Sequence, residues 1–467
     1  MIHVALEEVE LPDFGEPTVE PKLTSEIYRT RLDAARARAS SAGLDFLVIY
    51  ADREHSANMA YLTGFDPRFE EALLVVSQQS TPVIVVGNEG WGYVGISPLE
   101  LRPLLFQSFS LLSQSRNESP SLARVLESAG ISSGSRVGVV GWKYFTQRES
   151  RAPDQWLEIP SYIADTLREV AGDPSRVKNA NALFMNATDG LRVSNELEQL
   201  AAFEYAACHT SSAIRNVLFG LEPGMTEFEA VRLMRLNGMP LSCHPMLSSG
   251  PRAAMGLPSP SSRVIERGDP FTTAVGVWGA LNCRAGFVVE DETDLPRGAR
   301  DYVDKLVAPY FRAIVSWYET IGIGVRGGEL FDVIQRHLGD PFFGVKLNPG
   351  HQIHLDEWVN SPIFAGSETE LRSGMAFQVD VIPATGTEYF TTNIEDGIAL
   401  ADDALRLGFE KHYPEAWQRI QRRREFMRDV LGIRLKPEVL PFSNIPGYLP
   451  PFLLNPERVM VVTGRRS

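Results

Sequence analysis

The stretch NPGHQIHLDEW (348–358) holds several residues whose types and spacing could perform chemistry. His351 follows Pro349-Gly350, a turn that would present the imidazole ring at the start of a strand. Because imidazole titrates near neutral pH, we predict that His351 acts as a general acid or base. In an extended chain His354 points to the opposite face from His351, so the two are not a simple ligand pair. We predict instead that His354 and Glu357 contact a substrate.

Two residues elsewhere in the chain carry groups of a reactive type. Arg252 follows the Ser-Gly turn in SSGPRAAM and is predicted to bind a substrate carboxylate, which a guanidinium can contact through two hydrogen bonds. Cys283 lies in a strand-like run. A thiol nucleophile would need a neighbouring base and a lowered pKa, and no feature of the sequence indicates either. We therefore interpret Cys283 as a core residue.

The composition of the chain excludes several classes of function. Its 467 residues suffice for two domains. A formal net charge of −14 repels phosphate backbones, so we expect no nucleic-acid partner. Three cysteines without CxxC spacing argue against a disulfide framework and a structural zinc site. The N-terminus is acidic and interrupted by proline, and no run approaches the roughly 18 apolar residues of a membrane helix. We therefore expect a cytoplasmic protein that binds no membrane.

The elements that must position these residues fall into two halves. Residues 1–25 are rich in proline and acids and are predicted to form an arm. From residue 26 to 180, the runs DFLVIY, ALLVV, PVIVVG and RVGVVGW are typical of buried strands, and helical segments lie between them. This alternation predicts an α/β N-terminal domain built around a mainly parallel or mixed sheet.

The second half, residues 181–435, contains an internal repeat. A long helical pattern is followed by a turn at Gly224 and a shorter helix, and a second long pattern is followed by Gly327 and another short helix. Strand-rich runs complete each unit, and the two turns lie about a hundred residues apart. We predict an α+β domain with pseudo-twofold internal duplication and a cleft between its halves. Residues 436–467 form an apolar, proline-rich tail that is predicted to pack over the body or across a dimer seam.

Short motifs in this chain resemble one family in their order and rough spacing. They are YLTGFDPRFEEALLVV (61–76), LRVSNELEQL (191–200), LEPGMTEFE, GHQIHLDEW, RSGMAFQVDVIP and NIEDGIAL. Together they resemble the creatinase/aminopeptidase P/prolidase family over residues 26 to about 405. The resemblance implies a pita-bread fold for the C-terminal domain, a homodimer, and a small-molecule substrate.

The resemblance also implies an altered site. Relatives hold two divalent ions with two Asp, one His and two Glu, which together can activate a water. The two Asp fall on Ala274 and Ala285, which cannot bind a metal, whereas the His falls on His351 and the two Glu fall on Asp380 and Glu395. We therefore expect no bound metal and no other cofactor, with a single ion on the three remaining residues as the alternative.

Without metals, the carboxylates of Asp380 and Glu395 should repel each other, so one of them should hold a proton at neutral pH. Such a pair can serve as acid and base, or can hold a cationic substrate group. His244 falls on a segment that lines the pocket in relatives. Arg68 falls near the place where creatinase-like dimers reach into the neighbouring site. The resemblance thus implies that both of these residues bind substrate.

These observations predict a metal-independent, creatinase-like hydrolase of a C–N bond in a small molecule. His351, Asp380 and Glu395 are its predicted catalytic residues. Two alternatives stay open. One is a metal-dependent Xaa-Pro aminopeptidase or dipeptidase, and the other is a catalytically inactive pita-bread binding protein.

Overall fold

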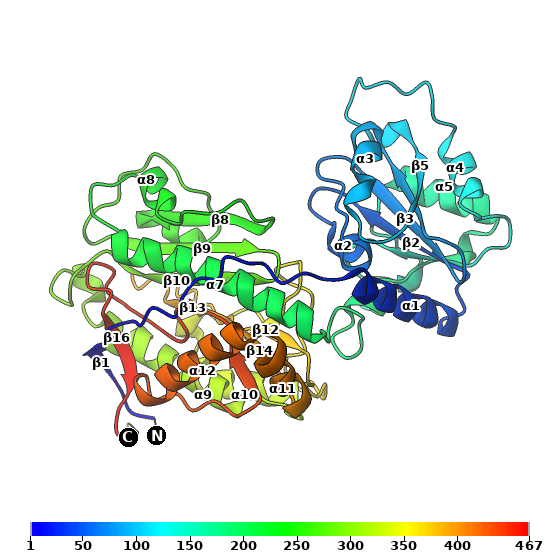
Figure 1. The fold of residues 1–467 in the computed structure, drawn as a ribbon. Helices are drawn as coiled ribbons and strands as arrows, with labels where there is room; N and C mark the ends of the chain where they lie inside the picture. The colour runs from blue at the N-terminus through cyan, green and yellow to red at the C-terminus, as the bar shows by residue number, and fades with distance from the viewer. Residues whose placement is uncertain (1, 466–467) are drawn as a thin grey trace. The chain divides into compact units, whose positions relative to one another are not determined.

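Two units make up the chain in the computed structural model, which describes residues 2–465. The first unit is Leu23–Arg192, and the second joins Met1–Lys22 to Val193–Ser467 (Figure 1). The boundary therefore lies at residues 192/193 rather than at the expected residue 180. The expected separate arm, residues 1–25, belongs to the second unit as far as Lys22.

The N-terminal unit is built on a six-stranded mixed sheet in the order β5-β4-β3-β2-β6-β7. Strand β2 pairs antiparallel with β3 and parallel with β6. Each strand run expected in this half is present, because apolar residues fill both faces of these short strands. The strands are β2 (Phe46–Ala51), β3 (Ala72–Ser77), β4 (Val83–Val86), β5 (Arg102–Leu105), β6 (Val137–Val140) and β7 (Val177–Asn179).

Helices of the N-terminal unit connect these strands and complete its core. The first helix ends before Gly43, whose φ of 72° is the left-handed conformation that glycine adopts readily after a helix. Side chains from the fourth and fifth helices, among them Leu126 and Ile163, are buried against the sheet. The helices are α1 (Ser25–Ser41), α2 (Ala57–Thr63), α3 (Asn88–Tyr93), α4 (Leu122–Ser128), α5 (Ser161–Ala171) and α6 (Ala182–Met185).

The C-terminal unit contains two four-stranded antiparallel sheets, in the orders β13-β10-β9-β8 and β11-β12-β14-β15. The strands of the first are β8 (Leu241–Ser249), β9 (Pro270–Val277), β10 (Ala280–Phe287) and β13 (Asn393–Glu395). Those of the second are β11 (His351–Gln352), β12 (Ala376–Gln378), β14 (Gly397–Leu400) and β15 (Val439–Pro441). Strands β13 and β14 are separated by a single residue, so the chain passes directly from one sheet to the other.

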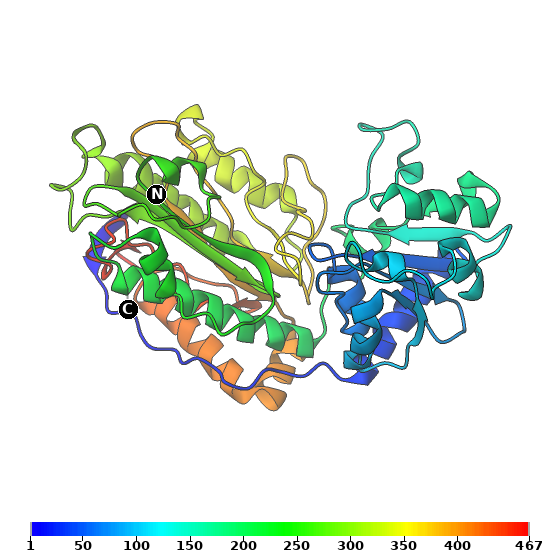
Figure 2. The ribbon, with the colours of Figure 1, turned by 90° about the horizontal axis from the view of Figure 1, so that it is seen from above.

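Helices cover the outer faces of these sheets (Figures 1 and 2). The long helix α7 packs on β9 and β10. The indole of Trp317 in α9 donates to the carbonyl oxygen of Pro349 over 2.9 Å, which ties this helix to the start of β11. The helices are α7 (Leu197–Gly220), α8 (Glu227–Arg232), α9 (Ala308–Thr320), α10 (Gly327–Leu338), α11 (Asp403–His412) and α12 (Pro414–Asp429).

The expected internal duplication is present. In each half, a long helix, a six-residue connection and a shorter helix precede strands. The first short helix begins with a capping box made by Thr226 and Glu229, and at the second the Glu329 carboxylate accepts from the backbone N–H of Arg326. In both helices a glutamate in the first turn thus satisfies the backbone N–H of the residue that precedes the helix.

The chain ends of the C-terminal unit meet in a two-stranded sheet. Strand β1 (Val4–Glu8) pairs antiparallel with β16 (Arg458–Val462), so that Val4 lies opposite Val462. The tail also supplies β15, and its residues 439–453 are buried without exception. The tail is therefore part of the core of this unit. Among the described residues, no helix has both the length and the apolar character required to span a membrane.

Candidate active site

Strand register brings His351, Asp380 and Glu395 together where the two sheets of the C-terminal unit meet. His351 lies opposite Gln378 of β12, which in turn lies opposite Gly397 of β14. Asp380 is two residues beyond Gln378, and Glu395 is two residues before Gly397. Since side chains two apart in an extended chain project to the same face, all three point to one side. Local alternation and pairing thus explain the cluster.

A turn at Gly350 sets the orientation of His351. Gly350 has a φ of +109°, and a Cβ at this position would lie 2.9 Å from the carbonyl oxygen of Gln378, so only glycine is accommodated. The ring of His351 stacks on Trp358 with 4.2 Å between the ring centroids. Its Nδ1 lies 3.3 Å from the carbonyl oxygen of Gln352. An Nδ1–H donor to that oxygen leaves Nε2 facing the carboxylates.

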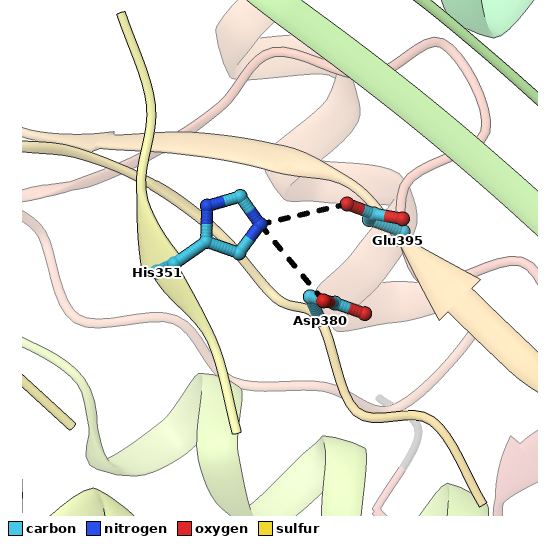
Figure 3. A group of neighbouring side chains, drawn as sticks. All are labelled: His351, Asp380 and Glu395. Carbon is cyan, nitrogen blue, oxygen red and sulfur yellow. Dashed lines mark ion pairs between the residues drawn. The ribbon is translucent and has the colours of Figure 1, made fainter. Parts of the chain in front are cut away.

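The three side chains converge without reaching hydrogen-bonding distance (Figure 3). His351 Nε2 lies 3.9 Å from Asp380 Oδ2 and 3.7 Å from Glu395 Oε1. One ligand atom from each residue lies within 4.8 Å of the other two. His351 Nε2, Asp380 Oδ1 and Glu395 Oε1 are also buried and have no hydrogen-bond partner among residues 2–465. Buried polar atoms of proteins are rarely left without a partner, so this group is arranged for a proton or a ligand.

Burial and mutual repulsion control the charge of the two acids. Burial is the main cause that holds the pKa of Asp380 well above its ordinary value, and the charge of Glu395 adds to it. Burial likewise raises the pKa of Glu395, with further contributions from the charges of Glu357 and Asp396. Glu357 reaches His351 from the half-exposed side, with 3.3 Å between Oε1 and Nε2. The site is therefore a buried acidic cluster that favours a bound proton or cation.

The wall facing these acids carries no charge. Cys283 lies opposite both Ala274 of β9 and Glu395 of β13, and Ala285 follows two residues later on the same face. The structure thus places methyl groups and a thiol where the resemblance implies the two aspartates. The pKa of the Cys283 thiol is raised, mainly by burial and then by the charge of Glu395. Cys283 is therefore a neutral thiol in the wall, as its interpretation as a core residue requires.

Gln378 is a site residue that the sequence analysis missed. It lies directly opposite His351, is fully buried, and both heteroatoms of its amide lack hydrogen-bond partners among the described residues. A buried amide without partners destabilises the fold, so its presence beside the cluster indicates a ligand contact. The signal in the sequence is a polar residue at the centre of the apolar strand AFQV, two positions before Asp380.

We expect Gln378→Met to raise the free energy of unfolding of the ligand-free protein by about 1–2 kcal/mol, because a side chain of similar shape replaces an unsatisfied amide. Urea unfolding would measure the change. Gln335→Met on the exposed face of α10 is the matched control and should have little effect. A Gln378→Met protein that is clearly less stable than the wild type would show that the amide has a structural partner.

The other predicted histidines lie outside this cluster. The ring of His354 packs edge-on against Phe203 of α7, with 5.2 Å between centroids, and the Leu355 N–H donates to its Nδ1. His244 is exposed, in the irregular part of β8 between Cys243 and Met246. No hydrogen bond or ion pair joins His244 to the cluster in the part of the chain that the structure describes. Their predicted roles as substrate ligands gain no support from these positions.

The guanidinium of Arg252 is bound to other side chains of the protein. Its guanidinium binds the carboxylate of Glu227, whose side chain is fully buried at the start of α8, and donates to Ser261 Oγ over 2.7 Å. Glu227 also accepts from the backbone N–H groups of Ser249 and Ser261. Because a buried carboxylate requires a partner, Arg252 is engaged in holding this loop, and its binding of a substrate carboxylate stays a prediction.

Arg68 belongs to the N-terminal unit. Its side chain donates to the hydroxyl of Tyr93 over 3.3 Å and lies 3.5 Å from a carboxylate oxygen of Asp66. Its backbone φ of 58° is unusual for a residue with a side chain. A role for Arg68 in a neighbouring subunit stays a prediction.

Comparisons with known proteins agree with this fold. Residues 201–405 match the sequence model of Metallopeptidase family M24. The structure is similar to dipeptidase PepE from Mycobacterium ulcerans, with a TM-score of 0.61 and 19% identity over 81% of this chain and 95% of that one. It is also similar to an Xaa-Pro dipeptidase from Bacillus anthracis (TM-score 0.59, 17% identity, 81% and 96% coverage). An X-Pro aminopeptidase from Thermotoga maritima gives a TM-score of 0.59 and 16% identity over 79% and 95%.

The fold and the site together define a two-domain pita-bread protein. No curated protein sequence matches the chain. The structural matches cover most of the chain and show the predicted two-domain pita-bread fold.

Proposed function

We propose that this chain hydrolyses a C–N bond in a small, peptide-like molecule without a two-metal centre. The observation that carries the proposal is the convergence of three buried atoms from His351, Asp380 and Glu395, none of which has a hydrogen-bond partner among the described residues. The match to a metallopeptidase family and the likeness to proteins named dipeptidase and aminopeptidase support hydrolysis of an amide C–N bond.

The donor set fits one divalent cation but not two. An imidazole nitrogen and two carboxylate oxygens are ligands of zinc, manganese and cobalt, and three protein ligands leave a coordination position open. A second ion would need further acids on the facing strands, where Ala274 and Ala285 stand. A single cation held by His351, Asp380 and Glu395 would polarise a carbonyl and lower the pKa of a water.

Proton transfer can be assigned to the chain's own residues. Because both acids have raised pKa values, a carboxylate that has lost its proton is a base able to accept one from an attacking water. The neighbouring acid, still protonated, can give its proton to the leaving nitrogen, which departs as an amine. His351 accepts a hydrogen bond from the water through Nε2, and Gln378 offers both a donor and an acceptor to the substrate's amide group.

The proposal has two forms, one in which the reaction needs no metal ion and one in which a single ion is bound. The uncharged wall of Ala274, Cys283 and Ala285 argues only against a second ion, and the metal-independent form is supported by the raised pKa values of Asp380 and Glu395, which allow proton transfer without a metal. The unpartnered atoms favour the other form, in which one ion is bound. In both forms the number of ions is at most one, and the same three residues carry the reaction.

The test combines metal analysis with an activity panel. The protein is purified without chelator, its metal content is measured, and it is then loaded with Mn, Co or Zn. Xaa-Pro dipeptides, other dipeptides, ureas and amidines are assayed in each state. We expect at most about one equivalent of metal per chain. We also expect His351→Ala to lower hydrolysis by roughly 10²- to 10⁴-fold, as loss of a group that holds or moves a proton does.

His412→Ala is the matched control, because His412 is exposed at the end of α11. It should leave both metal content and hydrolysis unchanged. Two tightly bound equivalents that are lost in His351→Ala would contradict the proposal and favour a two-metal Xaa-Pro peptidase. A wild-type protein that hydrolyses none of these substrates in any metal state would favour the inactive binding protein.

A further inference from the structure

A second cavity lies on the other face of the sheet from the candidate active site. Its volume is about 600 Å³, within the range of small-molecule sites. Helix α7, the 234–241 segment and the N-terminal arm enclose it. The arm runs alongside α7 in both views (Figures 1 and 2), and Asn444 fixes it there by donating to the carbonyl oxygen of Gly15.

Side-chain alternation separates this cavity from the active site. Thr210 lines the cavity, and its hydroxyl donates to Asn282 Oδ1 over 2.7 Å. The next residue, Cys283, faces Glu395 on the other side of the sheet. Val277 also lines the cavity, whereas Ala274 faces the site. The two places are thus on opposite faces of the same strands, and a ligand in one does not occupy the other.

Around the cavity, the acidic side chains are engaged and two arginine side chains can bind an anion. Glu16 is engaged, since its carboxylate lies 3.1 Å from His209 Nδ1. Asp13 accepts from the backbone N–H of Gly15 over 2.9 Å. Arg215 and Arg235 line the same cavity and form no ion pair among residues 2–465. The guanidinium of Arg215 lies over the ring of Phe219, 5.7 Å from its centroid, so neither arginine is neutralised by an acid of the described chain and both can bind an anion.

Two further features mark the cavity as a ligand site. His209 Nε2 is buried and has no hydrogen-bond partner in the described part of the chain. With Nδ1 held by Glu16, Nε2 is the ring atom left for a ligand. Arg235 has a φ of 50°, a left-handed conformation that costs energy for a residue with a side chain. Arg235 is exposed at the rim of the cavity, where its guanidinium can reach a bound anion.

Apolar side chains complete the lining. Leu236 and Leu241 are among the exposed large hydrophobic residues, and Met239 lies between them. We propose that this cavity binds a small organic anion, with its carboxylate or phosphate on Arg215, Arg235 and His209 and its hydrocarbon part against this apolar rim. The proposal concerns a second site and does not depend on the proposed hydrolysis.

Calorimetric titration of the full chain tests the proposal with four probes. Hexanoate and hexyl phosphate carry the two anionic groups, hexylamine reverses the charge, and acetate lacks the hydrocarbon chain. We expect saturable binding of hexanoate or hexyl phosphate, the tighter one identifying the preferred group. Acetate should bind more than about tenfold more weakly, and hexylamine should not bind. Arg215→Met should weaken binding of the preferred anion about tenfold, and Arg215→Met with Arg235→Met should abolish it.

Arg232→Met is the matched control, because Arg232 is exposed on α8 and does not line the cavity. It should bind the anion as the wild type does, and so should His351→Ala. Circular dichroism and the thermal midpoint verify that each variant is folded. Absence of saturable binding by either anion at millimolar concentration would overturn the proposal. So would anion binding that persists in the double variant but disappears in His351→Ala, because the anion would then occupy the active site.

Discussion

Replacing Arg284 with methionine is expected to destabilise the protein by about 3–5 kcal/mol, the range measured when one partner of a buried ion pair is removed. Arg284 and Asp396 are each 1% exposed, and Nη2 lies 2.9 Å from both carboxylate oxygens. The guanidinium also donates to the carbonyl oxygen of Tyr448 over 2.7 Å. The substitution would leave Asp396 charged and buried, and would release the tail from the strand that carries Cys283.

Urea unfolding of Arg284→Met and of the double variant Arg284→Met/Asp396→Asn would measure this effect. The double variant should recover part of the loss, because it no longer buries an unpaired charge. Arg267→Met is the control, since Arg267 also contacts two acids, Glu290 and Asp294, but at the surface. It should hardly shift the urea midpoint. Equal midpoints for Arg284→Met and the wild type would refute the assignment of this pair as a structural clamp.

A chain that ends at Leu435 is expected to be insoluble. The deletion removes β15 from the second sheet of the C-terminal unit and β16 from its pairing with β1. It also removes large side chains that are at most 1% exposed, namely Ile445, Tyr448, Leu449, Phe452, Leu453, Val459, Met460, Val461 and Val462. At about 1.5–3 kcal/mol for each buried side chain, their loss exceeds the roughly 5–15 kcal/mol by which a domain is stable.

Partition between soluble and pelleted fractions, followed by circular dichroism, would measure the outcome. A chain ending at Asn455 is the graded control, because it keeps β15 and the buried residues up to Leu453 and loses only β16 and its flanks. It should be less stable than the full chain but more soluble than the shorter one. A folded, soluble chain ending at Leu435 would show that the tail is an accessory segment.

Local pattern was enough to predict much of the fold. The strands from β2 to β4 and β6 were predicted because continuous apolar runs bounded by Gly, Pro and Ser have few other stable conformations. The duplication was visible because two helix–turn–helix units repeat the same local chemistry. The resemblance located His351, Asp380 and Glu395, and the structure brings them within 4.8 Å. Their catalytic role stays a prediction.

Long-range pairing was not visible in the sequence. Residues 1–25 were predicted as an arm and residues 436–467 as a tail that packs over the body or across a dimer seam, but the pairing of β1 with β16 from opposite ends of the chain was not predicted. No local pattern specifies such a partner, because any extended apolar segment can pair with another. The domain boundary at residues 192/193 also depends on which contacts form, and composition changes only gradually there.

The candidate active site shows most clearly which features follow from the sequence and which depend on the tertiary structure. The sequence by itself determined which reactive groups the chain contains, how they alternate along each strand, and that two acids of the family resemblance are replaced by alanine. Only the tertiary structure decided that Gln378 lies beside His351 and that Arg252 is bound to Glu227. The reason is physical. A side chain's chemistry and direction follow from its own residue and strand, whereas its partner and its burial depend on segments far away in the chain.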